Sequence, residues 1–368
     1  MSLNQREQSN RNHLKDTKPY VHKKIQRFEE KIRRGESIAI IQMQYNYQCN
    51  LTCEHCCVKR LQGQSSKRSM TVEDVRSLAR QADAMGLARF VITGGEPLTF
   101  KDLDEVVAAI NPQKFFINID TNGWFLDAAR ARHLKAIGVD RVQLSIDSFD
   151  EAGHDAFRRR KGSYQRTMAA VDACQQEGMD LFIQTVVTKE RLYSKEFIDF
   201  IEYFNGRGIG VFVSFAKPVG AWERRYEGCI DNNSREVQGS DLYYFRQLEQ
   251  KYRLFSHLTP GYGLDMGCIA VKGMFSVTQF GDVLPCPYMH VSLGNIFSEP
   301  LQDIVQRGLG YKYFGERMET CVIAQDRNFF KKILENKIYD KPLPVACADV
   351  FTDEDKTKIP FNTVMKSL

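Results

Sequence analysis

The sequence has no uninterrupted apolar run of about 18 residues, the length that a membrane-spanning helix requires. It also has no apolar segment near the N-terminus that would indicate a secretory signal. Ten cysteines in a chain without such a signal indicate a reducing compartment, where thiols bind metals more often than they form disulfides. These absences predict a cytoplasmic protein without a membrane partner.

Concentrated positive charge is also missing. The net charge is +5, but Lys and Arg are spread along all 368 residues. Recognition of nucleic acid usually needs a basic patch, so we expect no nucleic-acid partner. In the polar and basic residues 1–37, Val21, Ile25, Phe28 and Ile32 recur at helical spacing. This face predicts a helix packed on the outside of the main domain, with a peptide- or partner-docking helix as the alternative.

From residue 38 onward, short β-rich runs alternate with helical patterns. The expected strands are Ile38–Tyr47, Arg89–Thr93, Lys114–Asp120, Arg141–Asp147, Leu181–Thr188 and Gly210–Phe215. The expected helices are Thr71–Gly86, Leu103–Ile110, Leu126–Ile137, Tyr164–Glu177, Lys195–Asn205 and a sixth after Gly239. This alternation indicates parallel βαβ units, and six of them predict an α/β fold with an open or partial barrel. Ligands are expected at the carboxyl ends of the strands.

Three cysteines, Cys49, Cys53 and Cys56, follow the first expected strand with the spacing C-x3-C-x2-C. Three thiolates on one short loop can ligate three irons of a [4Fe–4S] cluster, which leaves the fourth iron without a protein ligand. An iron with a free position can bind and activate a small molecule, whereas an electron-transfer cluster normally has all its irons ligated. The spacing therefore predicts chemistry at the cluster.

Other polar residues stand at the ends of the later strands. They are Gly94, Gly95, Glu96 and Pro97 after the second strand, Thr121 and Asn122 after the third, Ser145 and Asp147 closing the fourth, and Thr185 in the fifth. Because a barrel gathers the carboxyl ends of its strands on one rim, a single site is expected to contain all of them.

The cysteine loop followed by Gly94–Pro97 resembles the radical S-adenosylmethionine (radical SAM) superfamily over roughly residues 38–220. The resemblance implies a partial (β/α)6 barrel, a [4Fe–4S] cluster on the three cysteines, and SAM bound to the open iron. It also implies roles in binding SAM. Gly94 and Gly95 would approach its methionine end, Glu96 or nearby carbonyls would accept from its ammonium, and Ser145 and Asp147 would face its ribose. Thr121 and Asn122 would face the sulfonium or the substrate.

Arg158 extends this resemblance. It matches an arginine that faces the SAM carboxylate in the family, within a stretch whose next residue is usually glycine. Here that next residue is Arg159, so the resemblance does not predict the conformation of the local turn.

The periodicity ends after Phe215, and the sequence divides into an N-terminal extension (1–37), a barrel (38–220), a connector (221–261) and a smaller α+β unit (262–368). In the last unit, Cys268, Gly281 and Cys286 form the pattern C-x12-G-x4-C across an expected β-hairpin. The pattern resembles the SPASM extension, or its shorter form Twitch, and implies an auxiliary iron–sulfur cluster.

The ligands of that auxiliary cluster are less regular, because the sequence has neither the C-x2-C-x5-C run of the longer form nor the C-x2-C of the shorter form. Cys321 and Cys347 are expected to complete a four-cysteine site with Cys268 and Cys286. The alternatives are a cluster with an open iron, ligation by Cys229 or His290, a zinc site, and unrelated buried cysteines.

The resemblance implies an enzyme that cleaves SAM reductively to a 5′-deoxyadenosyl radical and removes a hydrogen atom from a small molecule or a peptide. An electron donor such as flavodoxin or ferredoxin would supply the electron. We expect a net oxidation, in which the auxiliary cluster accepts an electron from the substrate or binds it. The alternatives are a redox-neutral epimerase with a thiol such as Cys229 as hydrogen donor, a peptide-modifying maturase, and a non-catalytic electron carrier or cluster scaffold.

Overall fold

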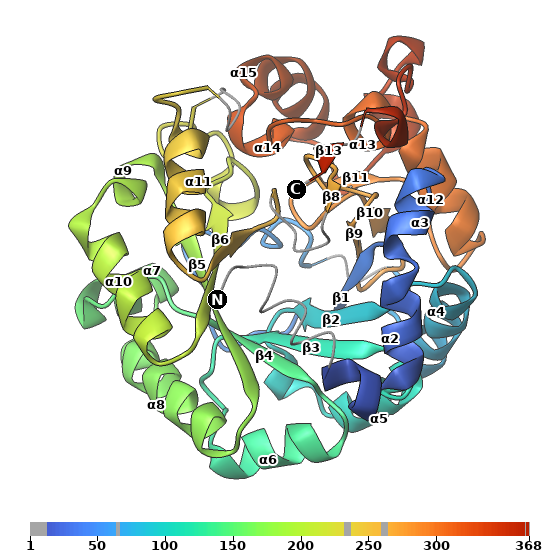
Figure 1. Cartoon of the computed structure of the whole chain (residues 1–368). Coiled ribbons are helices and arrows are strands. Elements are labelled where there is room, and N and C mark those ends of the chain that lie inside the picture. The colour runs from blue at the N-terminus through green and yellow to red at the C-terminus, as the bar shows by residue number, and fades with distance from the viewer. Residues whose placement is uncertain (1–12, 64–66, 232–236, 259–263, 365, 368) are drawn as a thin grey trace.

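The computed structural model describes residues 13–367 except 64–66, 232–236, 259–263 and 365. Six parallel strands form the centre of one curved sheet with helices around it (Figure 1). The strands are β1 (Ile40–Asn46), β2 (Arg89–Gly94), β3 (Phe116–Thr121), β4 (Arg141–Ser145), β5 (Asp180–Val187) and β6 (Gly210–Phe215). The predicted partial barrel is confirmed.

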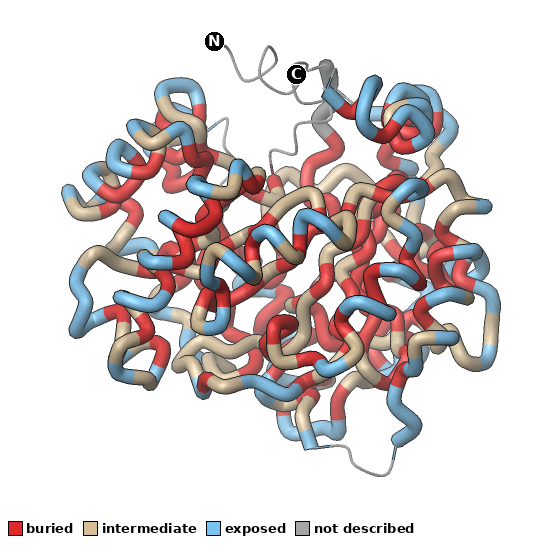
Figure 2. The backbone as a smooth tube through the Cα atoms, turned by 90° about the horizontal axis from the view of Figure 1, so that it is seen from below, coloured by how far each residue is buried: buried red, intermediate tan, exposed pale blue. Residues whose placement is uncertain are grey.

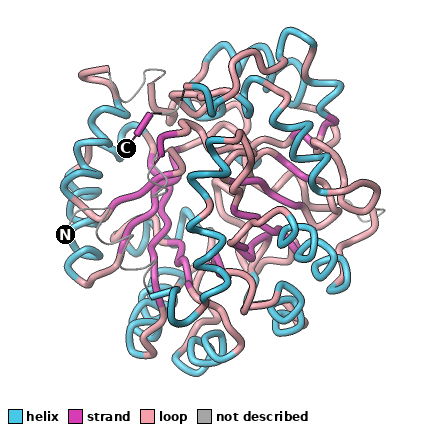
Figure 3. The backbone as a smooth tube through the Cα atoms, turned by 45° about the vertical axis from the view of Figure 1, so that its right-hand side comes forward, coloured by secondary structure: helices cyan, strands magenta, loops and turns pink. Residues whose placement is uncertain are grey.

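The helices that follow these strands lie on the outside of the sheet (Figures 1 and 3). They are α4 (Val72–Ala84), α5 (Leu103–Ile110), α6 (Ala128–Ala136), α7 (Glu151–Arg158), α8 (Ser163–Gln176), α9 (Lys189–Leu192), α10 (Lys195–Gly206) and α11 (Asp241–Lys251). Helix α4 begins with the capping box of Thr71 and Asp74, in which each side chain accepts from the other residue's backbone N–H.

Alternation along the strands places polar side chains on the inside of the barrel. In β3, for example, Ile117 and Ile119 are fully buried on the helix side, while Asn118 and Asp120 line the inner cavities. Successive residues of a strand point to opposite faces, so the same chain segment supplies both surfaces. Figure 2 shows the buried backbone inside a rim of exposed helix and loop residues. The apolar core therefore lies between the sheet and the helices.

The N-terminal segment forms two short helices, α2 (Pro19–Gln26) and α3 (Phe28–Arg33), against the outside of the barrel. The four apolar residues predicted for one face are all buried, which confirms the packing interpretation. The ammonium of Lys24 donates to the carbonyl oxygens of Leu87 (2.9 Å) and Lys114 (3.0 Å), which precede β2 and β3. The segment thus covers the end of the barrel opposite the carboxyl ends of the strands. Residues 1–12 lie outside the described residues.

The sheet continues past both ends of the six-strand unit, in the order β10-β9-β1-β2-β3-β4-β5-β6-β7. Strand β7 (Leu254–Ser256) pairs with β6, so the expected connector contributes a strand as well as α11. Strand β9 (Met274–Val277) pairs in parallel with β1, and the predicted hairpin turns at Gly281 into antiparallel β10 (Val283–Leu284). The C-terminal unit is therefore joined to the barrel through the sheet.

Short elements complete the C-terminal third. The strands are β8 (Leu264–Asp265), β11 (Val291–Ser292), β12 (Val345–Ala346) and β13 (Lys366–Ser367). The α-helices are α12 (Leu301–Leu309), α13 (Lys312–Gly315), α14 (Val322–Gln325), α15 (Arg327–Phe329) and α16 (Cys347–Val350), and Phe330–Ile338 forms a π-helix. Four short 3-10 turns are Pro97–Thr99, Gly220–Trp222, Asp353–Asp355 and Phe361–Thr363. Among the described residues, no helix is long and apolar enough to cross a membrane.

Candidate active site

The cysteine loop after β1 opens onto a cavity of about 320 Å³ at the carboxyl ends of the strands. Ten of the residues predicted for the SAM site line it: Cys49, Cys53, Cys56, Gly94, Gly95, Glu96, Thr121, Asn122, Ser145 and Arg158. The parallel sheet brings these residues together from four strand ends, as the barrel prediction required.

Two glycines after β2 hold the cysteine loop in place. The backbone N–H of Gly95 donates to the Asn46 carbonyl, and that of Glu96 donates to the Gln48 carbonyl, both at 2.7 Å. A Cβ on Gly95 would lie 1.9 Å from the Gln48 oxygen, and Gly94 has a positive φ of 126°. Both features require glycine, so one reason for the pair is close contact with the cysteine loop.

Glu96 is buried and accepts hydrogen bonds from three groups. Its carboxylate accepts from Thr121 Oγ1 (2.5 Å), from the Asn122 N–H (2.8 Å) and from the Leu98 N–H (3.1 Å). Its side chain thus ties the end of β3 to the turn after β2. Both carboxylate oxygens have partners within the protein, which makes Glu96 a residue that positions the loops around the cavity.

Asp147 and Arg158 form a buried ion pair beside the cysteine loop. Their side chains approach to 2.6 Å, and Arg158 Nη1 lies 3.7 Å from the Cys53 sulfur. The positive charge of Arg158 is one cause of the low pKa of Asp147, about 2, although burial acts in the opposite direction. Arg159 takes the left-handed conformation (φ 54°) at the end of α7. Arg159 therefore adopts the left-handed turn conformation that glycine favours.

Three residues predicted for SAM binding do not line the cavity: Pro97, Asp147 and Thr185. Thr185 is fully buried on the helix side of β5, where its hydroxyl accepts from Arg191. Its neighbours Gln184 and Val186 line the cavity instead. The reason is strand alternation, since adjacent side chains point to opposite faces. Asp147 contacts two residues that line the cavity, Arg158 through the ion pair and Val186 through its backbone N–H (3.0 Å).

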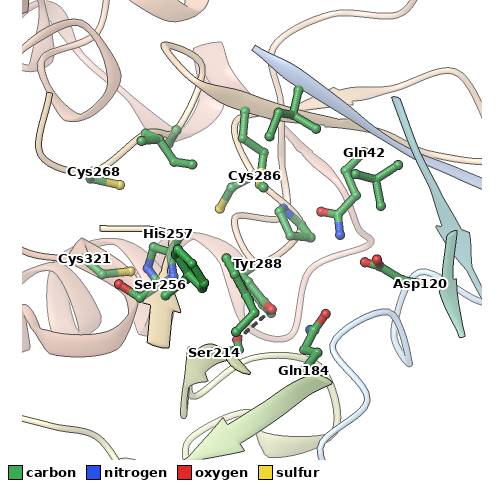
Figure 4. Close-up of a pocket in the computed structure, with 18 of the residues that line it drawn as sticks. Gln42, Asp120, Gln184, Ser214, Ser256, His257, Cys268, Cys286, Tyr288 and Cys321 are labelled. Carbon is green, nitrogen blue, oxygen red and sulfur yellow. Dashed lines mark hydrogen bonds between the residues drawn. The ribbon is translucent and has the colours of Figure 1, made fainter. Parts of the chain in front are cut away.

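A second cavity, of about 190 Å³, lies between the barrel and the C-terminal unit and is lined by Cys268, Cys286 and Cys321. Figure 4 shows these three cysteines around the same space, together with His257 at the end of β7. Cys347 does not line this cavity; it lies at the start of α16 and forms a side-chain hydrogen bond with Tyr311. The structure thus gathers three of the four predicted cysteines.

The two cavities share a wall of mostly polar side chains: Gln42, Asp120, Gln184, Ser214, Lys217, Pro287 and Tyr288. Tyr288 and Ser214 hydrogen bond at 2.8 Å, and Figure 4 shows this pair facing Gln42, Asp120 and Gln184. Burial raises the pKa of Asp120 to about 7, so this carboxyl changes charge near neutral pH.

Lys217 is the buried cation of this shared wall. Its ammonium donates to the Phe215 carbonyl oxygen (2.7 Å) and lies 4.0 Å from the centre of the Tyr288 ring. Burial lowers its pKa, and nearby thiols act in the opposite direction: Cys321, Cys286, Cys57 and Cys229. A positive charge thus lies near two SPASM thiols, Cys286 and Cys321, and near Cys57, the neighbour of Cys56 in the sequence.

No role in the site was predicted from the sequence for Lys217, His257 or Tyr288. The alternation of polar residues within the strands, as at Gln42 and Gln184, was the available signal for a polar interior. His257 had no such signal, because it follows a three-residue strand that the sequence pattern did not reveal.

A family model of the radical SAM superfamily matches residues 43–213. A second family model, an iron–sulfur cluster-binding domain called SPASM, matches residues 268–326. The chain is a radical SAM protein with a C-terminal SPASM domain. Together the two matches span more than half of the sequence and contain the two cysteine patterns on which the resemblance depended.

Curated relatives of this radical SAM protein carry several names. The AdoMet-dependent heme synthase of Methanosarcina barkeri is 27% identical over 281 residues, which cover 70% of this chain and 78% of that protein. The GTP 3′,8-cyclase of Marinobacter nauticus is 24% identical over 311 residues, covering 79% and 89%. The relatives therefore share the superfamily without sharing one reaction.

Solved structures resemble the fold. SuiB of Streptococcus suis, in a structure with its precursor peptide SuiA, gives a TM-score of 0.57 at 18% identity, covering 76% of this chain and 68% of that chain. SuiB bound to SAM gives 0.54 at 17% identity, covering 76% and 67%. This likeness establishes the α/β barrel with a smaller C-terminal domain.

The cofactors of the chain follow from its two domains: a [4Fe–4S] cluster, SAM and auxiliary iron–sulfur chemistry in the SPASM domain. The donor sets fit these groups, because Cys49, Cys53 and Cys56 line the first cavity and Cys268, Cys286 and Cys321 line the second. Within the described part of the chain, no three ligating side chains converge as a single metal ion requires. A zinc ion brings its ligands to one centre, whereas a cluster spreads them over several irons.

Proposed function

We propose that the chain cleaves SAM and uses the resulting radical to remove a hydrogen atom from a substrate bound between its two cysteine sets, in a net oxidation. The observation that carries the proposal is the wall shared by the two cavities. The cysteine loop lines one cavity, the SPASM cysteines line the other, and the residues shared by the two are mostly polar. A substrate bound against this wall is close to both sets.

We assign Cys49, Cys53 and Cys56 to the first cluster, which together with SAM supplies a 5′-deoxyadenosyl radical when reduced by a flavodoxin- or ferredoxin-like donor. Gly94 and Gly95 give backbone access on one side, while Thr121, Asn122 and Ser145 face the cavity from the next strands. His55 lies in the wall, stacked on Phe157 at 4.5 Å between ring centres, and offers a flat surface for the adenine.

The substrate proposed for this space is a polar small molecule or a peptide segment. Amide, carboxyl and hydroxyl groups of Gln42, Gln184, Asp120, Ser214 and Tyr288 can hydrogen bond to hydroxyl or amide groups of a ligand. After the hydrogen atom leaves, the substrate radical would lose one proton and would give one electron to the oxidised iron–sulfur cluster that the SPASM cysteines would hold. Asp120, with its pKa near neutrality, is placed to accept that proton.

A redox-neutral reaction needs a hydrogen donor that faces the substrate. The thiol considered for this role, Cys229, is buried and lines neither cavity. Its sulfur lies 4.0 Å from the Arg225 carbonyl oxygen. This position favours the net oxidation over an epimerisation that uses Cys229.

The test is anaerobic reconstitution with iron and sulfide, followed by addition of SAM and a reductant. We expect 5′-deoxyadenosine from the wild type and none from the variant Cys49→Ala/Cys53→Ala/Cys56→Ala. The matched control is Cys174→Ala, since Cys174 is fully buried in α8 away from both cavities. A reducible protein that leaves SAM intact would instead be an electron carrier or a cluster scaffold, and the proposal would fail.

A further inference from the structure

Three thiols line the SPASM cavity, but a four-iron cluster with every iron ligated by protein needs four ligands. Cys268 lies just before the hairpin, Cys286 just after it, and Cys321 at the start of α14. Cys347 is hydrogen bonded to Tyr311 outside the cavity, and Cys229 is also absent from the lining. No other cysteine lines this cavity among the described residues.

His257 is a candidate for the fourth ligand. It follows β7, whose pairing with β6 carries the chain to the same rim as Ser214. Its ring lines the cavity with the three cysteines, and Figure 4 shows it on the side of the cavity where Cys321 lies. Nε2 is buried and has no hydrogen-bond partner among the described residues. A buried imidazole nitrogen without a partner is costly, and a bound metal would offset that cost.

The position of the ring distinguishes His257 from a second histidine. His290 provides a contrast: its Nε2 is also buried without a partner among the described residues, but the ring is absent from the cavity lining. The two histidines can therefore serve as test and control.

We propose that His257 is the fourth protein ligand of the auxiliary cluster, giving a Cys3His site with Cys268, Cys286 and Cys321. The assignment rests on the proposed function, since it assumes that the SPASM cysteines hold a cluster. Imidazole ligation replaces a thiolate by a neutral group, which raises the reduction potential relative to a four-cysteine site. A higher potential suits a cluster that accepts an electron from a substrate radical.

The test uses the Cys49→Ala/Cys53→Ala/Cys56→Ala chain as reference, because its remaining iron reports the SPASM site alone. We expect about four irons per chain. After reduction and labelling of histidine with ¹⁵N, pulsed EPR should show one directly bound imidazole nitrogen. Adding His257→Ala should remove that nitrogen coupling. Adding His257→Cys should restore the cluster without the coupling and lower its potential.

Control variants separate His257 from its competitors. His290→Ala, Cys229→Ala and Cys347→Ala should each keep the iron content and the nitrogen coupling of the reference. Coupling that is missing from the reference or survives His257→Ala would overturn the assignment, as would loss of the cluster in Cys347→Ala or Cys229→Ala. A reference without iron would overturn the auxiliary cluster itself, whereas SAM cleavage by the wild type tests the proposed function separately.

Discussion

At the scale of single residues, Glu96 positions the loops around the first cavity, although both of its carboxylate oxygens already have hydrogen-bond partners within the protein. It holds the turn after β2 to the end of β3 through three hydrogen bonds. The sequence motif suggested a contact with SAM, but the motif does not reveal that protein groups already occupy both oxygens. This information depends on Thr121 and Asn122, which belong to the next strand–helix unit.

Glu96→Ala is expected to lower the free energy of unfolding by about 2–4 kcal/mol, because buried donors at Leu98, Thr121 and Asn122 lose their acceptor. SAM affinity should fall about tenfold or more, since the loops that line the cavity lose their link. Chemical denaturation and equilibrium binding of SAM measure the two effects. The control is Glu105→Ala on the exposed face of α5, which should change neither. Normal SAM affinity in Glu96→Ala would contradict the positioning role.

Asp120 carries a pH prediction. Its pKa is raised to about 7 by burial, from an ordinary value near 3.8. The folded state then holds a proton that the unfolded state releases, so this group contributes stability below about pH 4 and loses it as the pH rises to about 7. Asp120→Asn has no such loss and should gain stability relative to the wild type across this window, by up to about 4 kcal/mol.

The measurement is denaturation of both proteins at several pH values from about 5.5 to about 8.5, where the difference should grow up to about pH 7 and then stay constant. A difference that is independent of pH would contradict the raised pKa.

The limits of prediction from sequence are clearest at Thr185 and His257. Gln184 and Thr185 both lie in the predicted strand Leu181–Thr188. Successive side chains of a strand point to opposite faces, and the sequence does not say which of the two points inward. Gln184 faces the cavities and Thr185 does not. His257 reaches its cavity through β7, a strand of three residues that carries no sequence signal of its own.

At the scale of elements, the contact between the turn after β2 and the cysteine loop leaves no space for a side chain. The backbone of Gly95 lies so close to Gln48 that a methyl group would overlap its carbonyl. The expected strands and helices of the barrel all formed close to their predicted positions, because local periodicity and caps specify them. The close approach of two loops is a tertiary property that periodicity does not contain.

Gly95→Ala should therefore displace the cysteine loop and remove most of the iron of the first cluster. The overlap also predicts a loss of about 1–3 kcal/mol in the free energy of unfolding. Iron analysis and formation of 5′-deoxyadenosine provide the measurements. Gly206→Ala at the end of α10 is the control, because a Cβ there meets nothing within 4 Å. The prediction fails if Gly95→Ala keeps the iron and activity of that control.

At the scale of the whole molecule, one sheet joins the predicted barrel to the predicted C-terminal unit. Strand β9 belongs to the C-terminal unit by sequence but pairs with β1 through four residues, from Met274 to Val277. The hairpin itself was predicted from Cys268, Gly281 and Cys286. Its partner was not, because pairing between strands far apart in sequence leaves no local pattern.

The shared sheet predicts that both cysteine sets are lost together when the protein unfolds. The matched readouts are far-ultraviolet circular dichroism for the backbone and visible absorption for each cluster, using the variant without the first cluster to isolate the second. We expect coincident transitions in denaturant, because breaking the β1–β9 pairing disturbs both sites. Separate transitions for the two clusters would show instead that the C-terminal unit unfolds independently.

The pairing of β1 with β9 also has a consequence for biosynthesis. The ribosome makes β1 first and reaches β9 only after all six strand–helix units have been synthesised. At about 5–20 residues per second, the outer edge of β1 stays uncovered for at least about ten seconds in the nascent chain. An uncovered edge can pair with other chains. Cover of this edge by a chaperone during translation therefore protects the newly made chain, and the β1–β9 pairing forms only after residue 277 has been synthesised.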